Sequence, residues 1–498
     1  MKNVMALIMA GGKGERLMPL TAARSKPAIP FGGIYLLIDI TLSNCINSEV
    51  YKILVLPQYK SQTLIQHLEN GWNIFSGALG HFLRIVPPQM MRGDKWYQGT
   101  ADSIRQNLEM IEREKPSHLL ILSGDHVCKM NYSLFKEYHV DNDADVTIAV
   151  IETARDQAQE YGVLQVDGYY NVTGFQEKPE NPAPIPGDPD HSLVSMGIYI
   201  FKAEVLLELL KRDDKPDFGK DILPSILDSH KVMAYPYRRE NRIEEVVFFT
   251  DAGGSRAELP MEVAPDSGYW RDVGSLDAFW NANMDLCGLT PFFNLYGVRW
   301  PMRTMQRQFP PVKTLSVSQE DGAYLQGQAQ DSLVAHGSVI GGGTVRNSIL
   351  SYNVSVHRGA EVDESVVMEN VDVGRFSKIK KAIISEGARI PAGTEIGFNP
   401  KEDRKRFHVT ARGITVVTKE DFADQPEQPH WGHTPSSPRR SSGGSAEPGP
   451  NGPITLKGER PAPAEKPAPK PAAKKAAPVK KTEEAKPKTA KTGKKSAK

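Results

Sequence analysis

The sequence predicts two folded parts, an open α/β domain followed by a parallel β-helix, and a disordered basic tail after them. Three observations predict this arrangement. Short apolar runs alternate with helical patterns over residues 1–287, aliphatic residues recur with a fixed period over residues 331–420, and Pro, Ser, Gly, Ala and Lys dominate residues 421–498. Because 498 residues are too many for a single core, more than one domain is expected. Residues 288–330 are expected to connect the two folded parts.

The first part shows strands that are apolar along their whole length. The expected strands are Val4–Met9, Lys52–Leu56, His118–Leu122, Val146–Ile151 and Gly197–Phe201, and the expected helices are Gln62–Leu68, Ala101–Glu112 and Glu204–Lys211. Continuous apolar strands separated by helices indicate a sheet that is buried on both faces. In such a domain the loops at the carboxyl ends of the strands form the ligand crevice.

Twelve aliphatic positions predict the second part. They are Leu333, Val339, Val345, Leu350, Val356, Val362, Val367, Val373, Ile379, Ile384, Ile390 and Ile396. Their spacing runs 6, 6 and 5, so that each triplet recurs every 17 residues. A sustained hexapeptide period is typical of a parallel β-helix. A β-sandwich or a set of hairpins is the less favoured alternative, because turn signals there would not keep a fixed count.

The charge of the chain is unevenly distributed. The formal net charge is +1, but residues 451–498 hold 14 Lys and Arg against 4 Asp and Glu, so the first 450 residues are net acidic. The composition of the tail cannot bury enough apolar surface to offset backbone ordering, which predicts disorder. A basic tail can tether a protein to a polyanion such as nucleic acid or anionic lipid. A solvated tail without a dedicated partner is the favoured interpretation, since no aromatic residue interleaves the lysines.

The cysteines and the apolar runs indicate the compartment. Cys45, Cys128 and Cys287 are far apart and lack CxxC spacing, which excludes a disulfide framework and a cysteine zinc site. The run Val4–Ala10 is too short to span a membrane and ends in glycines. We therefore expect a reduced, soluble, cytoplasmic protein with no membrane partner.

A glycine-rich loop follows the first strand, and loops of this kind often bind phosphate groups, so we compare it with known phosphate-binding motifs. A dinucleotide-binding fingerprint fails because Leu17 stands where its third glycine belongs, and no run in this loop matches a P-loop. The glycines Gly11, Gly12 and Gly14 would let backbone N–H groups approach a triphosphate closely. The alternative, for the loop taken alone, is a glycine-rich turn with surface cations.

Charged residues near this loop and at later strand ends complete the pattern. Arg16 and Lys26 would neutralise charge on the outer phosphates during transfer. Asp125 and Asp272 each follow an apolar or aromatic run beside a glycine, and two such carboxylates could hold Mg²⁺ against phosphates. Taken singly, each aspartate would more readily be a helix cap or a loop residue. The pair Glu177-Lys178 joins a hydroxyl acceptor to a phosphate-binding cation, although alone it would be interpreted as a surface pair.

Eight segments carry a resemblance to a known family. They are "AGGKGERL", "SKPAIPFGG", "LSNCINS", "WYQGTADS", "SGDH", "QEKP", "SMGIYIF" and "YWRDVG". Together they resemble bacterial glucose-1-phosphate adenylyltransferases, also called ADP-glucose pyrophosphorylases, over residues 4–418. The pattern GGxGxR is shared by all sugar nucleotidyltransferases, whereas the segments that begin at Trp96, Ser195 and Tyr269 narrow the resemblance to the ADP-glucose branch.

The resemblance implies a fold, a reaction and an assembly. It implies a Rossmann-like nucleotidyltransferase domain, a left-handed β-helix, Mg²⁺ as cofactor and a homotetramer. The implied reaction joins ATP and α-glucose 1-phosphate to give ADP-glucose and pyrophosphate for glycogen synthesis. The implied catalytic residues are Arg16, Lys26 and Asp125; the implied glucose 1-phosphate contacts are Tyr97, Gly162, Glu177, Lys178 and Ser195; the implied nucleotide contacts are Gly11, Gly12, Gly14, Gln89 and Gly99; and the implied metal ligands are Asp125 and Asp272.

Two stretches depart from the family pattern. After Gly33, enteric members carry a lysine, an aromatic residue and an arginine that serve a sugar-phosphate activator, whereas this chain has Ile34, Tyr35 and Leu36. Without those cations, altered or weak activation is expected. Residues 404–406 (Arg-Lys-Arg) could still bind an anion, although a solvated charge run is favoured. Residues 238–268 are longer than usual and suggest an added hairpin of unassigned function.

Three rival functions remain open at this stage. One is a nucleotidyltransferase of the same fold that uses UTP, dTTP or GTP. The second is a non-catalytic regulatory subunit, which the retained charged residues of the site disfavour. The third is an acyltransferase built on the β-helix, which the small number of coils and the lack of a cysteine within them disfavour.

Overall fold

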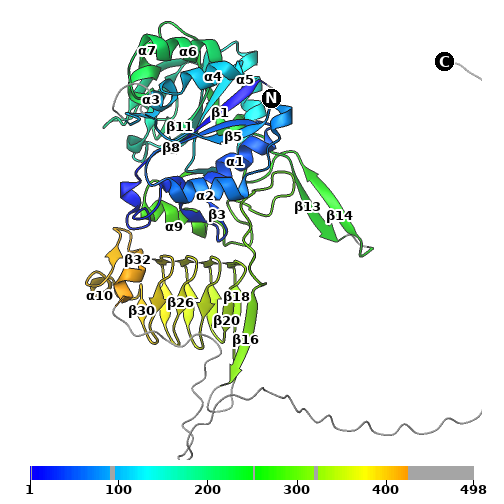
Figure 1. Cartoon of the computed structure of the whole chain (residues 1–498), viewed down its shortest axis with the longest axis vertical. Helices are drawn as coiled ribbons and strands as arrows, with labels where there is room; N and C mark the ends of the chain where they lie inside the picture. The colour runs from blue at the N-terminus through cyan, green and yellow to red at the C-terminus, as the bar shows by residue number, and fades with distance from the viewer. Residues whose placement is uncertain (2, 90–95, 251–252, 319–323, 424–498) are drawn as a thin grey trace, which may run out of the picture. The chain divides into compact units, whose positions relative to one another are not determined.

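The first part of the chain is an α/β domain built on a nine-stranded mixed sheet (Figure 1). The computed structural model describes residues 1, 3–89, 96–250, 253–318 and 324–423. The nine strands of the sheet are β1 (Val4–Ala10), β4 (Lys52–Pro57), β5 (Phe82–Ile85), β6 (His118–Ser123), β8 (Val146–Ala154), β9 (Gly162–Val166), β10 (Val172–Glu177), β11 (His191–Lys202) and β12 (Val232–Pro236). The main path of the sheet runs β10-β9-β11-β6-β1-β4-β5, with β8 beside β11 and β12 beside β8.

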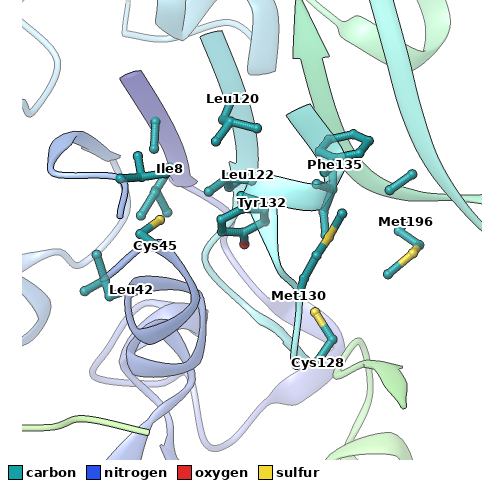
Figure 2. Packing of buried hydrophobic residues seen from close by; sticks show 14 of the residues in the cluster. Ile8, Leu42, Cys45, Leu120, Leu122, Cys128, Met130, Tyr132, Phe135 and Met196 are labelled. Carbon is teal, nitrogen blue, oxygen red and sulfur yellow. The ribbon is translucent and has the colours of Figure 1, made fainter. Parts of the chain in front are cut away.

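Both faces of this sheet are buried, as the continuous apolar runs predicted. Along β1, Ala6 and Ile8 enter one core cluster, whereas Met5 and Leu7 enter another on the opposite face. Figure 2 shows the first cluster, in which residues of β1, α1, β6, α5 and β11 meet in a dense apolar core. The predicted α/β class is confirmed.

The helices of the α/β domain differ from the expected pattern in one place. They are α1 (Leu37–Asn47), α2 (Gln62–Gly71), α3 (Thr100–Arg105), α4 (Leu108–Glu114), α5 (Tyr132–Asp141), α6 (Ala203–Arg212), α7 (Leu223–Ile226), α8 (Tyr237–Glu240) and α9 (Leu276–Met284). The prediction of a single helix over Ala101–Glu112 is therefore wrong, because this stretch is divided into α3 and α4. At the break, the Asn107 side chain donates to the Tyr97 hydroxyl at 2.9 Å and to the Ser103 carbonyl at 2.8 Å, and so competes with helical backbone bonding.

Strand β11 is longer than the run Gly197–Phe201 that was expected. It begins at His191, because residues 193 and 194 pair with β9 while the same strand pairs with β8. An irregularity in its pairing with β8 lies between Ser195 and Tyr199. Polar residues inside a buried strand therefore hid its first half from the sequence pattern.

Short ladders stand apart from the main sheet. They are β2 (Pro30–Phe31) with β3 (Tyr35–Leu36), β7 (His126–Cys128) with β15 (Trp270–Asp272), and β13 (Glu245–Thr250) with β14 (Arg256–Met261). The last pair confirms the hairpin suggested for residues 238–268.

The second part is a parallel β-helix whose strands form three sheets (Figure 1). Its strands are β16 (Lys313–Ser318), β17 (Tyr324–Gln326), β18 (Gln328–Gln330), β19 (Leu333–Val334), β20 (Val339–Gly341), β21 (Thr344–Arg346), β22 (Ile349–Leu350), β23 (Ser355–Val356), β24 (Glu361–Asp363), β25 (Val366–Val367), β26 (Asp372–Val373), β27 (Lys378–Lys380), β28 (Ala382–Ile384), β29 (Arg389–Ile390), β30 (Glu395–Ile396), β31 (His408–Val409) and β32 (Thr415–Val417), with α10 (Pro400–Asp403) before β31. The predicted architecture is confirmed.

The predicted register holds from Val345 onward but is wrong in the first coil. Ile340, not Val339, pairs with Val356, and Val334, not Leu333, pairs with Leu350. The first coil is one residue shorter because its corner is made by Gly341-Gly342-Gly343. A Cβ on Gly343 would lie 2.7 Å from the Val356 side chain, so only glycine permits this tight corner.

The β-helix core predicts a clear stability effect. Ile379 is 1% exposed and pairs with Ile396 on the next coil. Ile379→Ala is expected to lower the free energy of unfolding by about 2–4 kcal/mol through lost burial and a residual cavity. Urea unfolding measures this loss, with Lys378→Ala, at an exposed neighbouring position, as the control. Equal stability of the two variants would contradict the inward orientation of Ile379.

The two parts share one apolar cluster. Phe31, Tyr35 and Leu37 of the α/β domain belong to the same buried cluster as Ile349 and Ile383 of the β-helix. Within the described residues, no helix is both long and apolar enough to cross a membrane. The start predicted for the disordered tail, residue 421, is wrong by a few residues, because Lys419–Phe422 form a 3-10 helix. Residues 424–498 of the predicted tail lie outside the described residues.

Candidate active site

A short antiparallel ladder brings together two carboxylates that are far apart in the sequence. Asp125 is separated from the end of β6 by Gly124, and the next residue, His126, begins β7. Asp272 ends β15 and is the ladder partner of His126. Both carboxylates therefore lie at the carboxyl end of the central strands, where an α/β sheet binds its ligands.

Lys26 joins these two carboxylates. Its Nζ lies 2.8 Å from Asp125 Oδ2 and 3.2 Å from Asp272 Oδ1, and 12% of its side chain is exposed. Burial alone would lower the pKa of Lys26, but the charges of Asp125 and Asp272 outweigh it and raise this pKa above its usual value. The ammonium group therefore stays charged at neutral pH. We call Lys26, Asp125 and Asp272 the charged cluster.

Asp125 is held in its ionised form. Burial would raise the pKa of Asp125, but the charge of Lys26, the neighbouring His126 and a hydrogen bond from the Ser123 hydroxyl lower it well below the usual range. A carboxylate that stays ionised can act as an oxygen ligand at any physiological pH.

The glycine loop lies at the end of β1, next to the charged cluster. Gly14 has a positive φ of 64°, and a Cβ there would lie 2.9 Å from the Thr21 Cγ2 atom and 3.2 Å from the Lys26 Cβ atom. A side chain at Gly14 would thus displace Lys26 or Thr21. By contrast, apart from Gly12 itself and its two chain neighbours, no described atom lies within 4 Å of the Cβ position of Gly12. This open backbone is suited to close approach by a phosphate.

Arg16 follows the glycine loop in a 3-10 turn and reaches the neighbourhood of Asp272. Its guanidinium pairs with Glu160 at 2.7 Å, and 60% of its side chain is exposed. The Cβ position of Gly274 lies 3.0 Å from both Arg16 Nη2 and Asp272 Oδ2, so these two groups meet above Gly274. The structure therefore places Arg16 within reach of a ligand that contacts Asp272.

Glu177 and Lys178 lie at the end of β10, with Gly162 opposite Glu177 on β9. A Cβ on Gly162 would lie 2.5 Å from the ring of Phe175 and 3.1 Å from Glu177 Oε2, so this glycine makes room for both side chains. Burial raises the pKa of Glu177 above its usual value, with a further increase from Asp217 and a decrease from Lys178. Such a carboxylate is suited to accept hydrogen bonds from hydroxyl groups.

Ser195 is buried in β11 at the irregularity described above. Its hydroxyl donates to the Tyr199 hydroxyl at 3.4 Å and accepts the backbone N–H of Gly197 at 3.1 Å. Burial raises the pKa of Tyr199 to about 12, so its phenol remains a neutral hydrogen-bonding group.

For three of the predicted contact residues, the surroundings in the structure do not show a side chain that faces the site. The Tyr97 hydroxyl donates to the Val86 carbonyl at 3.1 Å, and the residue is 7% exposed, so its hydroxyl is already engaged inside the protein. A Cβ on Gly99 would lie 2.4 Å from the carbonyl oxygen of Pro216, which gives this glycine a packing role. Gln89 is exposed and directly precedes residues 90–95, which lie outside the described residues. Nucleotide contacts by Gln89 and Gly99 stay predictions.

Sequence reasoning missed several residues that the fold brings to the site. His126 Nε2 lies 3.7 Å from Asp125 Oδ1 and 4.0 Å from Asp272 Oδ1. Trp270 packs edge-on against both His126 and Tyr161, at ring distances of 5.7 and 5.6 Å. Asp217 adds a second carboxylate near Glu177. Trp270 belongs to a quoted segment and could have been found there, whereas the pairing of β7 with β15 gives no local signal.

The donor set of the charged cluster fits Mg²⁺. This cation is bound in proteins by one or two carboxylates together with substrate phosphates and water, and Asp125 and Asp272 supply two carboxylates beside the open glycine loop. Among the described residues there is no group of three or more His, Cys, Asp and Glu side chains that could hold a metal without a substrate.

Comparisons with known proteins give matches over most of the chain. Residues 5–288 match the family model described as nucleotidyl transferase, and residues 310–417 match the model described as GlmU-like, C-terminal hexapeptide. The chain is 44% identical over 426 residues to a glucose-1-phosphate adenylyltransferase of Paramagnetospirillum magneticum, covering 84% of this chain and 94% of the relative. It is 43% identical over 423 residues to glucose-1-phosphate adenylyltransferase 2 of Vibrio cholerae, covering 84% and 98%. A Rhodopirellula baltica relative of the same name is 42% identical over 444 residues, covering 88% and 94%.

Proposed function

Because this chain belongs to the glucose-1-phosphate adenylyltransferase family, we propose that it transfers AMP from ATP to α-glucose 1-phosphate, giving ADP-glucose and pyrophosphate for glycogen or another α-glucan. The observation that carries the proposal is the charged cluster, in which Lys26 contacts both Asp125 and Asp272 beside the open glycine loop.

The reaction requires charge neutralisation more than proton transfer. An oxygen of the sugar phosphate attacks the α-phosphorus of ATP, the bond to the β,γ-phosphates breaks, and pyrophosphate leaves. The attacking oxygen is already largely ionised at neutral pH, since the second pKa of a phosphate monoester is about 6. No general base is needed. The protein must hold two polyanions together and stabilise the leaving group.

Each charged side chain has a place in this scheme. The backbone of Gly11, Gly12 and Gly14 accommodates the triphosphate, with Lys26 and Arg16 as its cationic partners. Asp125 and Asp272 would hold Mg²⁺, which supplies electrostatic stabilisation of the phosphates when bound. The ion pair from Arg16 to Glu160 is largely exposed and easily broken, so Arg16 can turn toward a phosphate.

The proposed sugar contacts come from the end of β10 and from β11. Glu177 is positioned to accept hydrogen bonds from glucose hydroxyls, Ser195 and Tyr199 offer hydroxyls of their own, and Lys178 supplies a cation for the sugar phosphate. Lys178 adopts a positive φ of 48°, a backbone conformation that L-residues rarely adopt and that is found more often at functional sites.

The experiment that tests this function is pyrophosphate release with Mg²⁺ and glucose 1-phosphate, run in parallel with ATP, UTP, dTTP and GTP. Strong preference for ATP is expected. Preference for another nucleotide would retain the chemistry and overturn the pathway. If none of the four nucleotides is turned over, with or without sugar-phosphate effectors, a regulatory subunit of the same fold would be favoured.

The raised pKa of Glu177 predicts a pH dependence. Its pKa lies above the usual 4.5, so the acceptor carboxylate is lost at a higher pH than an ordinary glutamate would be. The KM for glucose 1-phosphate is therefore expected to rise as the pH falls toward the pKa of Glu177. Glu177→Gln should have a high KM and lack this part of the profile, while keeping the change caused by protonation of the substrate phosphate near pH 6. Identical profiles of the two proteins would contradict the role of Glu177.

A cavity of about 250 Å³ between the two folded parts bears on regulation. Its lining includes Ile34 and Leu36, where enteric members carry cations, together with Arg24 and Arg307. In this chain Arg24 pairs with Glu386, and Arg307 pairs with Glu369. Both arginines are therefore neutralised within the protein, which supports weak activation by phosphorylated sugars. Of the later cations, Lys405 pairs with Glu402 at 2.8 Å.

We expect fructose 1,6-bisphosphate and fructose 6-phosphate to change the rate of the wild-type enzyme by less than about fivefold, below the usual range of allosteric coupling. Leu36→Arg, which adds a cation to the cavity, should increase the response to either sugar phosphate. Initial rates over a series of effector concentrations measure both effects. Activation of the wild-type enzyme by more than an order of magnitude would contradict this prediction.

The assembly and compartment are also part of the proposal. The family resemblance supports a homotetramer, which light scattering after size exclusion would test. A cytoplasmic location is supported by the need for ATP and by Cys45, Cys128 and Cys287, which are all free and buried. Binding of a polyanion by the basic tail remains the less favoured interpretation, and the tail lies outside the described residues.

A further inference from the structure

Thr100 lies where the start of α3 meets the segment that begins with Asp217. It follows Gly99 and is the first residue of α3. Its hydroxyl donates to Asp217 Oδ2 at 3.4 Å and accepts the backbone N–H of Phe218 at 3.2 Å. One hydroxyl therefore uses both its donor and an acceptor position on the same short segment.

The backbone holds α3 against the same segment. The carbonyl oxygen of Pro216 accepts the N–H groups of Ala101 at 2.8 Å and Asp102 at 3.2 Å. The 2.4 Å separation between this oxygen and the Cβ position of Gly99 shows how closely the two chains approach. Because the backbone is fixed on both sides, the Thr100 hydroxyl has little freedom to leave Asp217.

Asp217 begins the segment that lies beside Glu177. Its Oδ1 accepts the N–H of Lys220 at 3.1 Å and caps a π-helical turn over Phe218–Ile222, a conformation often found at functional sites. The Cβ position of Gly219 lies 2.7 Å from Glu177 Oε2 and 3.6 Å from Asp217 Oδ1, so the two carboxylates meet above this glycine. The orientation of Asp217 therefore shapes the surface on which glucose hydroxyls would lie.

We propose that Thr100 is a positioning residue for the sugar phosphate, whose hydroxyl fixes the carboxylate of Asp217 beside Glu177. The inference rests on the proposed function, since it assigns Glu177 and Asp217 to the glucose side. Holding a carboxylate in one orientation before binding reduces the ordering that the sugar must impose. The same contact joins the segment of Asp217 to the start of α3.

The test compares Thr100→Val, which removes the hydroxyl at nearly constant volume, with Thr100→Ser, which keeps it. Thr100→Val is expected to raise the KM for glucose 1-phosphate by roughly tenfold, as for the loss of a hydrogen bond to a charged group. The KM for ATP should change by less than about twofold, and Thr100→Ser should behave as the wild type does. Thr100→Ala provides a second hydroxyl-free variant if the valine variant folds poorly.

Thr410→Val is the matched control. The Thr410 hydroxyl also donates to a carboxylate, that of Asp277, at 2.6 Å and accepts the backbone N–H of Ile414 at 3.1 Å, but it lies at the contact with the β-helix. This variant is expected to lower the melting temperature without changing either KM.

A double-mutant cycle separates action through Asp217 from a general loss of structure. If Thr100 acts through this carboxylate, Thr100→Val should add little to the KM effect of Asp217→Asn. Additive effects, equal increases in both KM values, or a serine variant as impaired as the valine variant would each overturn the proposal. A wild-type enzyme that does not use glucose 1-phosphate would instead overturn the proposed function, and this control is run first.

Discussion

Asp125→Asn is expected to lower kcat by about 10³-fold or more, because it removes a charge that organises both Lys26 and a metal ion around the reacting phosphates. The asparagine side chain occupies nearly the same volume, so the fold should persist. Initial rates of ADP-glucose formation at saturating ATP and glucose 1-phosphate measure the effect.

Asp145→Asn is the matched control for this variant. Asp145 also pairs with a lysine, Lys202, at 3.1 Å, and it directly precedes β8. Its replacement should leave kcat unchanged.

The lowered pKa of Asp125 means that the charge of this carboxylate stabilises the fold above about pH 3.8 and that this stabilisation is lost as the pH falls further. An Asp125→Asn variant with at least one tenth of the wild-type kcat would contradict the assignment.

Lys26→Met is expected to reduce both activity and stability. Its loss leaves the carboxylates of Asp125 and Asp272 close together without a cation, and removing one partner of a buried pair destabilises proteins by about 3–5 kcal/mol. In the proposed reaction Lys26 neutralises charge on the leaving pyrophosphate, so kcat should fall by about 10³-fold. Urea unfolding and initial rates measure the two effects separately.

Lys202→Met offers a close comparison, because Lys202 also bridges two carboxylates, Asp143 at 2.9 Å and Asp145 at 3.1 Å. It should lower stability and leave kcat unchanged. If both methionine variants lost stability alone, Lys26 would be a structural residue and the electrostatic role assigned to it would be wrong. Added Mg²⁺ should partly restore the stability of Lys26→Met, since the freed carboxylates can then bind the cation.

Much of the fold follows from patterns that are local in the sequence. The continuous apolar runs predicted the buried strands, and the recurring aliphatic positions predicted the β-helix. The sequence failed where one side chain or one corner changes the local geometry. Asn107 divides an otherwise continuous helical pattern by bonding Tyr97 and Ser103, and three consecutive glycines shorten the first β-helix coil by one residue.

The candidate site is less accessible to sequence reasoning, because its contacts cross long distances along the chain. The residue types at Lys26, Asp125 and Asp272 indicated phosphate and metal chemistry, but only the pairing of β7 with β15 brings the two carboxylates to one lysine. Asp217 gave no signal, since it lies in a polar stretch whose shape depends on a π-helical turn. Tyr97 is the opposite case. The sequence singled it out as a substrate contact, but its hydroxyl donates to the Val86 carbonyl inside the protein.

The central claim is that Asp125 and Asp272 act together on one cation beside the nucleotide phosphates. The most direct test is binding of Mn²⁺, as a paramagnetic substitute for Mg²⁺, followed by electron paramagnetic resonance in the presence of ATP. The account predicts that Asp125→Asn and Asp272→Asn each weaken this binding by at least about tenfold, while Asp145→Asn does not. Unchanged Mn²⁺ affinity in both site variants would contradict the account.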